Sequence, residues 1–360
     1  MSLRDERQAQ FAKLWVKSDR YSILNLCPRF GKIRTSINIL KAIKPKSILI
    51  AYPDNKIKDS WKDDFKELKY KDDKVTYSTH LSLKKLVGNK YDIIIIDEIH
   101  LLSAAQIEVC KELFVGNRCV LGLTGTLSAQ TEQTLDEELA LEVLAHYPIA
   151  QAIKEGVIAD YEITVITVPL DDKTFIQYKT KKKTEKKMFD SYGWVINNMQ
   201  RSGGNTMFLR LARMRIIQNS IAKLDKTKFI LNKHKDERIL VFCGITAIAD
   251  ALGIPSYHSK SSEKDVFQDF TEGKGNHLAV VKIGNTGVTY KPLNRVIINY
   301  FDSNGENLAQ KINRCMAMEY DTPDKKAHIY IVSSNEEVEL NWLKKALEFF
   351  DKTKIKYGHY

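Results

Sequence analysis

The chain has 360 residues, a formal net charge of +11 and a hydrophobic content of 43%, and its length exceeds the usual size of one hydrophobic core. We therefore expect two domains of roughly 150 residues each. The sequence has no apolar stretch of the roughly 20 residues that a membrane helix needs, and its first residues lack the apolar segment of a signal peptide, so it predicts an intracellular, cytoplasmic protein without membrane contact.

The first candidate phosphate-binding segment lies near the N-terminus. The pattern predicts a short strand at residues 21–26, a turn at residues 27–32 and a helix that begins at residue 33. This order of strand, turn and helix is that of a P-loop, in which backbone N–H groups and the helix N-terminus bind phosphates. Gly31 and Lys32 fit the Gly-Lys pair of that pattern, whose lysine reaches the terminal phosphates.

This segment departs from the P-loop pattern at two positions. Leu26 stands where the pattern has its first glycine, and Ile33 stands where it has the hydroxyl that ligates Mg²⁺. We expect that Thr35 or Ser36 replaces this hydroxyl, that water fills the position, or that the metal is held weakly. The segment alone therefore does not establish a nucleotide site.

Two adjacent carboxylates follow a run of four isoleucines at residues 93–96. An unbroken apolar run predicts a central strand of a parallel sheet, and such sheets bind ligands at the carboxyl ends of their strands. Asp97 and Glu98 would lie at that edge, where one carboxylate can hold a Mg²⁺ ion that bridges phosphates and the other can orient or deprotonate a water molecule. An isolated Asp-Glu pair can equally begin a surface loop, so the rest of the sequence must decide.

The positive charge is concentrated in one segment. Residues 171–235 contain 12 Lys and 4 Arg against 4 Asp and 1 Glu, an excess of 11 that equals the net charge of the whole chain. Such a segment is typical of proteins that bind the phosphate backbone of nucleic acids, although a lysine-rich stretch can also be a solvated face. Within it, Arg210 and Arg213 interrupt a helical apolar pattern, and Trp194 is available to stack on bases or separate them. The plain alternative is a helical linker that packs on the second domain.

Taken in order, these segments and several later ones resemble superfamily 2 helicases and translocases. The resemblance covers nearly the whole chain and rests on the P-loop at residues 28–32, motif Ia at 47–53, the strand end at Thr79, the Asp-Glu-x-His box at 97–100, motif III at 121–126, motif IV at 238–243, motif V at 284–288 and motif VI at 310–314. It implies an α/β fold with two RecA-like domains that contain parallel sheets and close over ATP. We accordingly expect a first domain at residues 1–165, a basic helical elaboration at 166–235 and a second domain at 236–360.

The resemblance also implies roles for the matching residues. Those that would bind ATP are Gln8, Pro28, Arg29, Phe30, Gly31, Lys32, Ile33 and Arg34. Those that would carry hydrolysis are Lys32, Asp97, Glu98, Gln310 and Arg314, with Asp97 and Thr35 as Mg²⁺ ligands. Those that would contact nucleic acid or couple it to the ATP site are Thr79, His100, Thr124, Thr126, Gly287, Arg210 and Arg213. For Gln8 the alternative is a surface glutamine on an amphipathic helix, and for His100 it is a satisfied polar group.

Motif VI departs from the family pattern as well. Asn313 stands at its glycine and Ala317 at its final arginine, so Arg314 alone would have to compensate the charge of the transition state. An arginine in that role contributes a factor of about 10³ or more to the rate. Together with Ile33, this departure raises the alternative of an ATPase that is slow or depends on a partner.

The resemblance thus implies an ATP- and Mg²⁺-dependent helicase or translocase that acts as a monomer and unwinds or remodels nucleic acid, with single-stranded or branched DNA favoured over RNA. The short chain resembles helicases of phages and mobile elements that act in recombination, which is an argument by analogy. The alternative is a degenerate or partner-dependent ATPase that acts mainly as the nucleic-acid-binding subunit of a larger complex.

Overall fold

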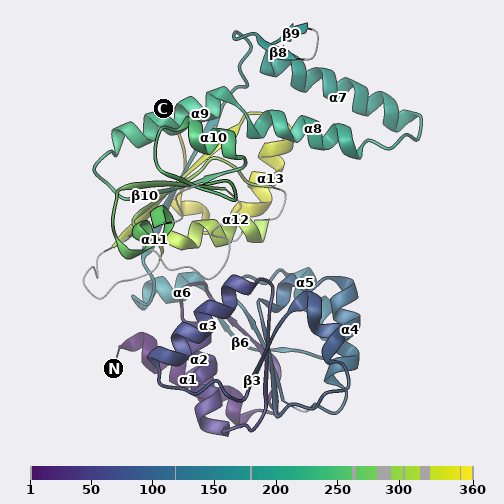
Figure 1. Ribbon diagram of the computed structural model, residues 1–360, viewed down its shortest axis with the longest axis vertical. Helices are drawn as coiled ribbons and strands as arrows, with labels where there is room; N and C mark the ends of the chain where they lie inside the picture. The colour runs from purple at the N-terminus through teal and green to yellow at the C-terminus, as the bar shows by residue number, and fades with distance from the viewer. Residues whose placement is uncertain are drawn as a thin grey trace. The chain divides into compact units, whose positions relative to one another are not determined.

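The computed structural model of the chain describes residues 2–117, 119–178, 181–261, 265–281, 293–302, 305–316, 325–348 and 350–358. The chain divides into two compact units, the first ending at Ile158 and the second beginning at Ala159 (Figure 1). Throughout these described ranges, every helix is too short or too polar to cross a bilayer.

The first unit is built around a six-stranded sheet in which all neighbouring strands are parallel. Its strand order is β3-β2-β4-β5-β1-β6. Along the chain the strands are β1 (Tyr21–Leu26), β2 (Ile48–Tyr52), β3 (Val75–Thr79), β4 (Ile93–Asp97), β5 (Val120–Thr124) and β6 (Val143–Tyr147). Every residue of β4 is buried, which agrees with a central strand covered on both faces.

Helices cover both faces of this sheet, with α1 to α3 on one side and α4 and α5 on the other (Figure 1). The helices are α1 (Leu3–Lys17), α2 (Lys32–Ile43), α3 (Asn55–Glu67), α4 (Ala104–Phe114), α5 (Ala129–Leu139) and α6 (Ile149–Lys154), and the 3₁₀ turns are η1 (His80–Leu86) and η2 (Ile99–Leu101). A capping box, in which Ser2 and Asp5 each bond the backbone N–H of the other, fixes the start of α1.

The strand order brings three loops together. β5 pairs with β4 on one side and with β1 on the other, so the carboxyl ends of these three strands are neighbours at one edge of the sheet. The loops that leave these ends contain the predicted P-loop, the Asp-Glu box and the predicted motif III. These three segments therefore meet at the edge where parallel sheets bind ligands.

The second unit contains a seven-stranded sheet, also parallel throughout, with the order β11-β12-β10-β13-β14-β7-β15. Its strands are β7 (Asp160–Val168), β10 (Ile239–Cys243), β11 (Ser256–Tyr257), β12 (His277–Val281), β13 (Arg295–Ile298), β14 (Lys326–Ser334) and β15 (Ile355–Gly358). The elements around the sheet are α9 (Ile221–Lys233), α10 (Thr246–Ala251), α11 (Asp265–Glu272), α12 (Gly305–Ile312), η3 (Asn313–Cys315), α13 (Glu337–Leu347) and η4 (Lys352–Lys354). Two units with parallel sheets confirm the predicted α/β fold class.

A helical arm, residues 176–218, extends from the second unit (Figure 1). It consists of an antiparallel pair of short strands, β8 (Ile176–Tyr178) and β9 (Lys181–Lys183), followed by α7 (Glu185–Arg201) and α8 (Met207–Gln218). The helices α7 and α8 pack side by side. The guanidinium of Arg213 in α8 stacks on the Phe189 ring of α7 at 3.9 Å and passes Gly193, where a Cβ would come within 3.2 Å of it.

The structure places the boundary between the units earlier than the expected residue 165. β7 pairs with β14 along its whole length, from Asp160 to Val168, so this strand belongs to the second sheet. The expected elaboration at residues 166–235 is also part of the second unit, where α9 packs on β7 and β14 and the arm projects from the sheet. The pattern of β7 identifies a strand but carries no information about which sheet it joins.

Candidate active site

The predicted P-loop forms the turn between β1 and α2. Gly31 is the N-cap of α2 and has a φ of 100°, a left-handed conformation that glycine adopts without strain. A Cβ at residue 31 would lie 2.3 Å from Nε2 of Gln8, so the close approach of α1 also requires glycine here. The N-terminus of α2 has no side-chain cap, so its first N–H groups can bind phosphate.

Lys32, the first residue of α2, joins the P-loop to the Asp-Glu box. Its Nζ lies 2.8 Å from Oε1 of Glu98, and the two side chains are 14% and 19% exposed. Glu98 follows β4 directly and has a φ of 51°, an uncommon conformation for a residue with a side chain that often marks a functional site. The predicted phosphate-binding lysine and the predicted water-orienting carboxylate therefore share one partly buried site.

Asp97 ends β4 and is almost fully buried. Its Oδ2 accepts a hydrogen bond of 2.9 Å from Nε1 of Trp61 in α3. Burial raises the pKa of Asp97, and the charge of Glu98 raises it further, whereas Lys32 and the Trp61 N–H lower it. A bound cation would stabilise a carboxylate in this setting, and carboxylate oxygens are ligands that Mg²⁺ prefers.

This set of donors suits a metal that binds together with a nucleotide. Within the part of the chain that the structure describes, no three His, Cys, Asp or Glu side chains lie close enough together to hold a metal ion. Mg²⁺ commonly takes one or two carboxylates and completes its octahedron with phosphate oxygens and water. Asp97 beside Lys32 and the P-loop fits that kind of site.

His100 links Glu98 to the predicted motif III. Its Nδ1 lies 2.8 Å from the Thr124 hydroxyl and 3.5 Å from Oε2 of Glu98, and its Nε2 lies 3.5 Å from the Thr126 hydroxyl. Burial lowers the pKa of His100 to about 4, so the ring is neutral at pH 7. The Thr124 hydroxyl donates to the Thr126 carbonyl oxygen, so it accepts from His100, which assigns the proton to Nδ1. His100 is thus a satisfied buried histidine whose partners are the predicted motif III and Glu98.

Gly125 lies between these two threonines and contacts the P-loop. A Cβ at residue 125 would lie 2.8 Å from Nζ of Lys32 and 3.2 Å from the carbonyl oxygen of Leu26. Any side chain there would displace Lys32 or the turn. No role for Gly125 followed from the sequence, because its packing requirement is visible only once its neighbours are known.

Trp61 and His80 both hold Asp97, and neither was predicted as a site residue. Trp61 donates to the Asp97 carboxylate, and Nε2 of His80 lies 3.0 Å from the Asp97 carbonyl oxygen. Burial lowers the pKa of His80 to about 4, so its neutral ring donates from Nε2 to that carbonyl. Trp61 follows the segment that resembles motif Ia and His80 follows Thr79, but no spacing in the sequence identifies either as a partner of Asp97.

Gln8 contacts the P-loop from α1. Its Nε2 donates to the Phe30 carbonyl oxygen at 2.8 Å, and the side chain is only 3% exposed. The rings of Phe11, Phe30 and Tyr147 pack together beside it, with centroids 5.0 to 5.7 Å apart. The alternative of a surface glutamine is therefore wrong, and the Gln8 side chain bonds the P-loop turn, beside the nucleotide site that it was predicted to serve.

The hydroxyls expected to replace the one missing at Ile33 are directed into their own helix. The Thr35 hydroxyl donates to the Gly31 carbonyl oxygen at 3.2 Å, and the Ser36 hydroxyl donates to the Lys32 carbonyl oxygen at 3.0 Å. Both side chains are fully buried. This arrangement argues against Thr35 as a Mg²⁺ ligand and favours water in that position or a weakly held metal.

The remaining P-loop residues divide into three environments. Pro28, Arg29 and Ile33 are half-buried in or beside the turn, and Phe30 is fully buried. Arg34, which was expected to bind nucleotide, instead forms ion pairs with two carboxylates of α3, those of Asp64 and Glu67. Its guanidinium therefore fastens α2 to α3.

The two predicted motif VI residues lie in the second unit. Gln310 is in the last turn of α12 and partly exposed, and Arg314 is in η3 and buried. Gly287 and Ala317 lie outside the described residues. Gln310 and Arg314 thus occupy one helix end of this unit.

The predicted nucleic-acid residues differ in their accessibility. Thr79 ends β3, and its hydroxyl donates to the Ser82 hydroxyl at 3.1 Å. Arg210 is exposed, and its Nε donates to the Thr206 hydroxyl at 3.2 Å. Arg213 packs inside the arm, where burial lowers its pKa. Arg210 is accessible to a phosphate, whereas Arg213 is only partly exposed and stacks on Phe189, which argues for a role in packing α7 against α8.

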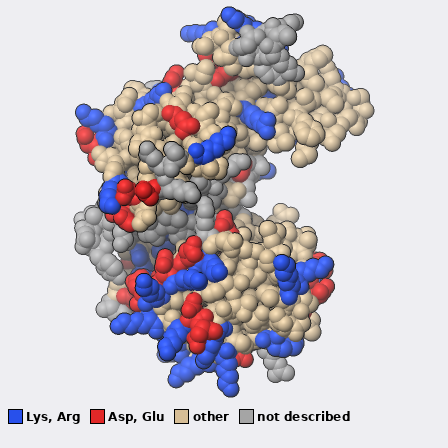
Figure 2. Space-filling view, in the orientation of Figure 1, with Lys and Arg blue, Asp and Glu red and all other residues tan. Residues whose placement is uncertain are grey.

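The arm exposes large apolar side chains. Trp194 is 69% exposed, and Met207, Phe208 and Leu211 on α8 are also exposed. Figure 2 shows that, on the face in view, the far end of the arm carries mainly uncharged side chains. The surface of the arm therefore combines aromatic groups with scattered cations.

Comparison with known proteins gives two matches. The family model described as the helicase conserved C-terminal domain matches residues 222–318. The DNA 3'-5' translocase XPB2 of Sulfurisphaera tokodaii is 22% identical over 323 residues, which cover 80% of this chain and 72% of the relative. Two parallel α/β units of RecA-like type, with the ordered motifs at the strand ends, agree with both matches. Both matches support the resemblance of this chain to the superfamily 2 helicases and translocases.

Proposed function

We propose that the protein is an ATP-dependent DNA translocase whose hydrolytic site is the first-unit cluster around Lys32 and Glu98. The observation that carries this proposal is the continuous chain of contacts from Lys32 through Glu98 and His100 to Thr124. It joins a phosphate-binding group, a candidate base and a candidate coupling loop. Helicases of this superfamily use ATP, typically with Mg²⁺, and the name of the relative supports DNA as the substrate.

In this proposal the P-loop and Asp97 position the nucleotide. The first N–H groups of α2 and the Lys32 ammonium would hold the terminal phosphates, and the Asp97 carboxylate would hold the metal. When bound, Mg²⁺ neutralises charge on the phosphate oxygens. Trp61 and His80 keep Asp97 oriented through its carboxylate and its carbonyl oxygen.

Glu98 is the proposed base that orients and deprotonates the attacking water. Its carboxylate pairs with Lys32 in the structure, so Lys32 must transfer to the phosphates before Glu98 can accept a proton. The neutral His100 contacts the second oxygen of Glu98 and keeps the carboxylate tied to Thr124. Arg314 is the proposed arginine that compensates charge in the transition state.

The arm is the proposed additional contact with DNA. Trp194 and Phe208 expose flat aromatic surfaces, and stacking of a base on such a ring contributes about 1 to 3 kcal/mol. Arg210 is exposed two residues after Phe208 and can contact a phosphate. We propose that the arm favours single-stranded or branched DNA, because stacking requires unpaired bases.

A second candidate is an ATPase that needs a partner protein. It is favoured by the burial of Thr35 and Ser36, which leaves the P-loop without an available hydroxyl for the metal. Such a protein would bind DNA in a salt-dependent manner but hydrolyse ATP slowly until a partner completes the site.

The test is phosphate release by the purified protein with Mg²⁺ and ATP, in the presence of single-stranded DNA, duplex DNA, branched DNA, RNA or no nucleic acid. We expect stimulation by DNA, strongest with single-stranded or branched forms. The variants Lys32→Ala and Glu98→Gln should abolish it. Hydrolysis that no nucleic acid stimulates, combined with salt-dependent DNA binding, would favour the partner-dependent candidate.

A further inference from the structure

The root of the arm is tied to α9 by a buried carboxylate. Glu185, the first residue of α7, is 3% exposed and accepts hydrogen bonds from the Ile221 N–H at 2.7 Å and the Ser220 hydroxyl at 3.2 Å. These groups form the N-terminus of α9, where a negative charge is favourable. The arm is therefore not a loosely attached insertion, because the first residue of α7 bonds the N-terminus of α9.

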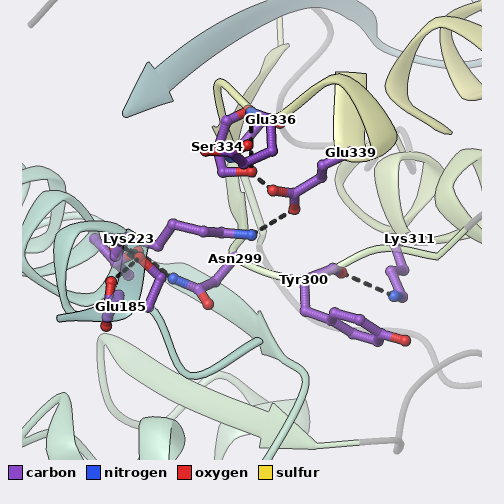
Figure 3. Close-up of polar contacts among 11 residues, drawn as sticks. Glu185, Lys223, Asn299, Tyr300, Lys311, Ser334, Glu336 and Glu339 are labelled. Carbon is purple, nitrogen blue, oxygen red and sulfur yellow. Dashed lines mark hydrogen bonds and ion pairs between the residues drawn. The ribbon is translucent and has the colours of Figure 1, made fainter. Parts of the chain in front are cut away.

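A buried ion pair continues this connection. Lys223 of α9 and Glu339 of α13 are 1% and 0% exposed in their side chains, and Nζ lies 2.6 Å from Oε1 (Figure 3). The other oxygen of Glu339 accepts the Ser334 N–H at 2.7 Å, at the end of β14. A pair this deep is costly to desolvate, and apolar residues of similar volume are often at least as stabilising. We infer that the main effect of this pair is to fix the positions of α9 and α13 relative to each other.

The same network reaches the motif VI helix. Asn299, directly after β13, donates from Nδ2 to the Lys223 carbonyl oxygen at 3.3 Å. The next residue, Tyr300, accepts from Nζ of Lys311 in α12 at 3.1 Å through its carbonyl oxygen (Figure 3). The side chain of Gln218, the last residue of α8, lies close enough to the Tyr300 hydroxyl to interact with it. Asn299 and Tyr300 thus contact the arm, α9 and α12 from adjacent positions.

We propose that Lys223 and Glu339 are positioning residues. They fix α9, on which the start of α7 is held, relative to α12, the helix that precedes Arg314. Lys311, which the network holds, lies three residues before Arg314 on the same chain segment. Nucleic acid bound by the arm would then act on Arg314 through α9 and Tyr300. This inference rests on the proposed function, since it needs an arm that binds DNA and an arginine that serves hydrolysis.

The test compares Lys223→Met combined with Glu339→Gln against the unaltered protein. The double variant removes both charges at nearly constant volume, so neither charge is left buried and unpaired. The matched control is Lys228→Met, which removes a lysine from the same helix outside this network. For each protein, three quantities are measured: the thermal unfolding midpoint, the affinity for fluorescent single-stranded DNA, and the ATP hydrolysis rate with and without that DNA.

We expect the double variant to keep its DNA affinity and its hydrolysis rate without DNA, and to lose about tenfold in stimulation by DNA, within the usual range of coupling between sites. The control should behave like the unaltered protein. A double variant that DNA stimulates normally would overturn the positioning role. The role would also be overturned if the rates with and without DNA fell together, in proportion to the loss of folded protein. An unaltered protein that DNA does not stimulate would instead contradict the proposed function on which the inference rests.

Discussion

The two units each contain a close lysine–glutamate pair, and the pairs differ in their surroundings. Lys32 and Glu98 in the first unit are 2.8 Å apart and partly exposed, at 14% and 19%. Lys223 and Glu339 in the second unit are 2.6 Å apart and essentially inaccessible, at 1% and 0%. The first pair can separate and admit a ligand at little cost, because solvent reaches both charges. The second cannot separate without leaving charges buried.

The difference in burial predicts a functional role for the first pair and a structural role for the second. A partly exposed pair contributes about 1 kcal/mol or less to stability, whereas breaking a buried pair costs about 3 to 5 kcal/mol. Substitutions at the first pair should therefore change turnover and spare folding. Substitution of one partner in the second pair should mainly lower the stability of the second unit.

The largest expected effect is on turnover in Glu98→Gln. Loss of the proposed base should lower the ATP hydrolysis rate by about 10² to 10⁴-fold, the usual contribution of a general base. ATP binding and the unfolding midpoint should change little, since Gln can still contact Lys32. Steady-state phosphate release, fluorescent nucleotide binding and thermal unfolding measure the three quantities. Normal turnover in this variant would remove Glu98 from the mechanism.

Next in size is the loss of stability in Glu339→Gln alone. The charge of Lys223 would remain buried without its partner, which should lower the free energy of unfolding of the second unit by about 3 to 5 kcal/mol. Adding Lys223→Met should recover most of that loss. Urea unfolding followed by circular dichroism measures both changes. Equal stability of the single variant and the unaltered protein would show that the pair is less buried than the structure has it.

A smaller effect concerns Lys311 and pH. Burial lowers the pKa of Lys311 from 10.5 to about 8, so between these values the unfolded chain holds a proton that the folded protein has released. Stability relative to Lys311→Met should therefore rise with pH across that window, by roughly 2 to 3 kcal/mol in total. Urea unfolding of both proteins at pH 7.5, 9 and 10.5 measures the difference. A difference that falls with pH would contradict the burial of a charged Lys311.

The smallest expected effect is that of Trp61→Phe. The variant keeps most of the buried ring and removes the N–H that donates to Asp97, which should cost about 1 kcal/mol of stability. Because that N–H favours the charged carboxylate, its loss should raise the Mg²⁺ concentration needed for half-maximal hydrolysis several-fold. Trp15→Phe, which removes another buried indole N–H of the first unit, is the matched control. An unchanged Mg²⁺ requirement would limit Trp61 to a packing role.

The strands that carry the cluster around Lys32 and Glu98 could be predicted, because a buried parallel strand is a continuous apolar run. The polar residues that follow such a strand lie at the edge of the sheet that binds ligands. Lys32, Asp97, Glu98 and His100 were named from this logic and from the family resemblance, and the strand order brings them together. The residues that support them, Trp61, His80 and Gly125, were not predicted as site residues. Their contribution depends on which atoms they meet across the fold, and sequence spacing does not encode that.

The second unit was predicted less well for the same reason. β7 was assigned partly to the first domain, because pairing between distant strands leaves no local pattern. The lysine-rich segment suggested a cationic face, but Arg213 is partly buried between α7 and α8, and Lys223 is buried against Glu339. Composition records how many charges a segment has and does not record which of them face solvent.

The most direct test of the proposed translocase function is the rate of ATP hydrolysis by the unaltered protein, measured with Mg²⁺ in the presence and absence of single-stranded DNA. We predict that DNA stimulates hydrolysis at least about tenfold, as expected for coupled sites. Equal rates with and without DNA, from protein that binds both ATP and DNA, would contradict it.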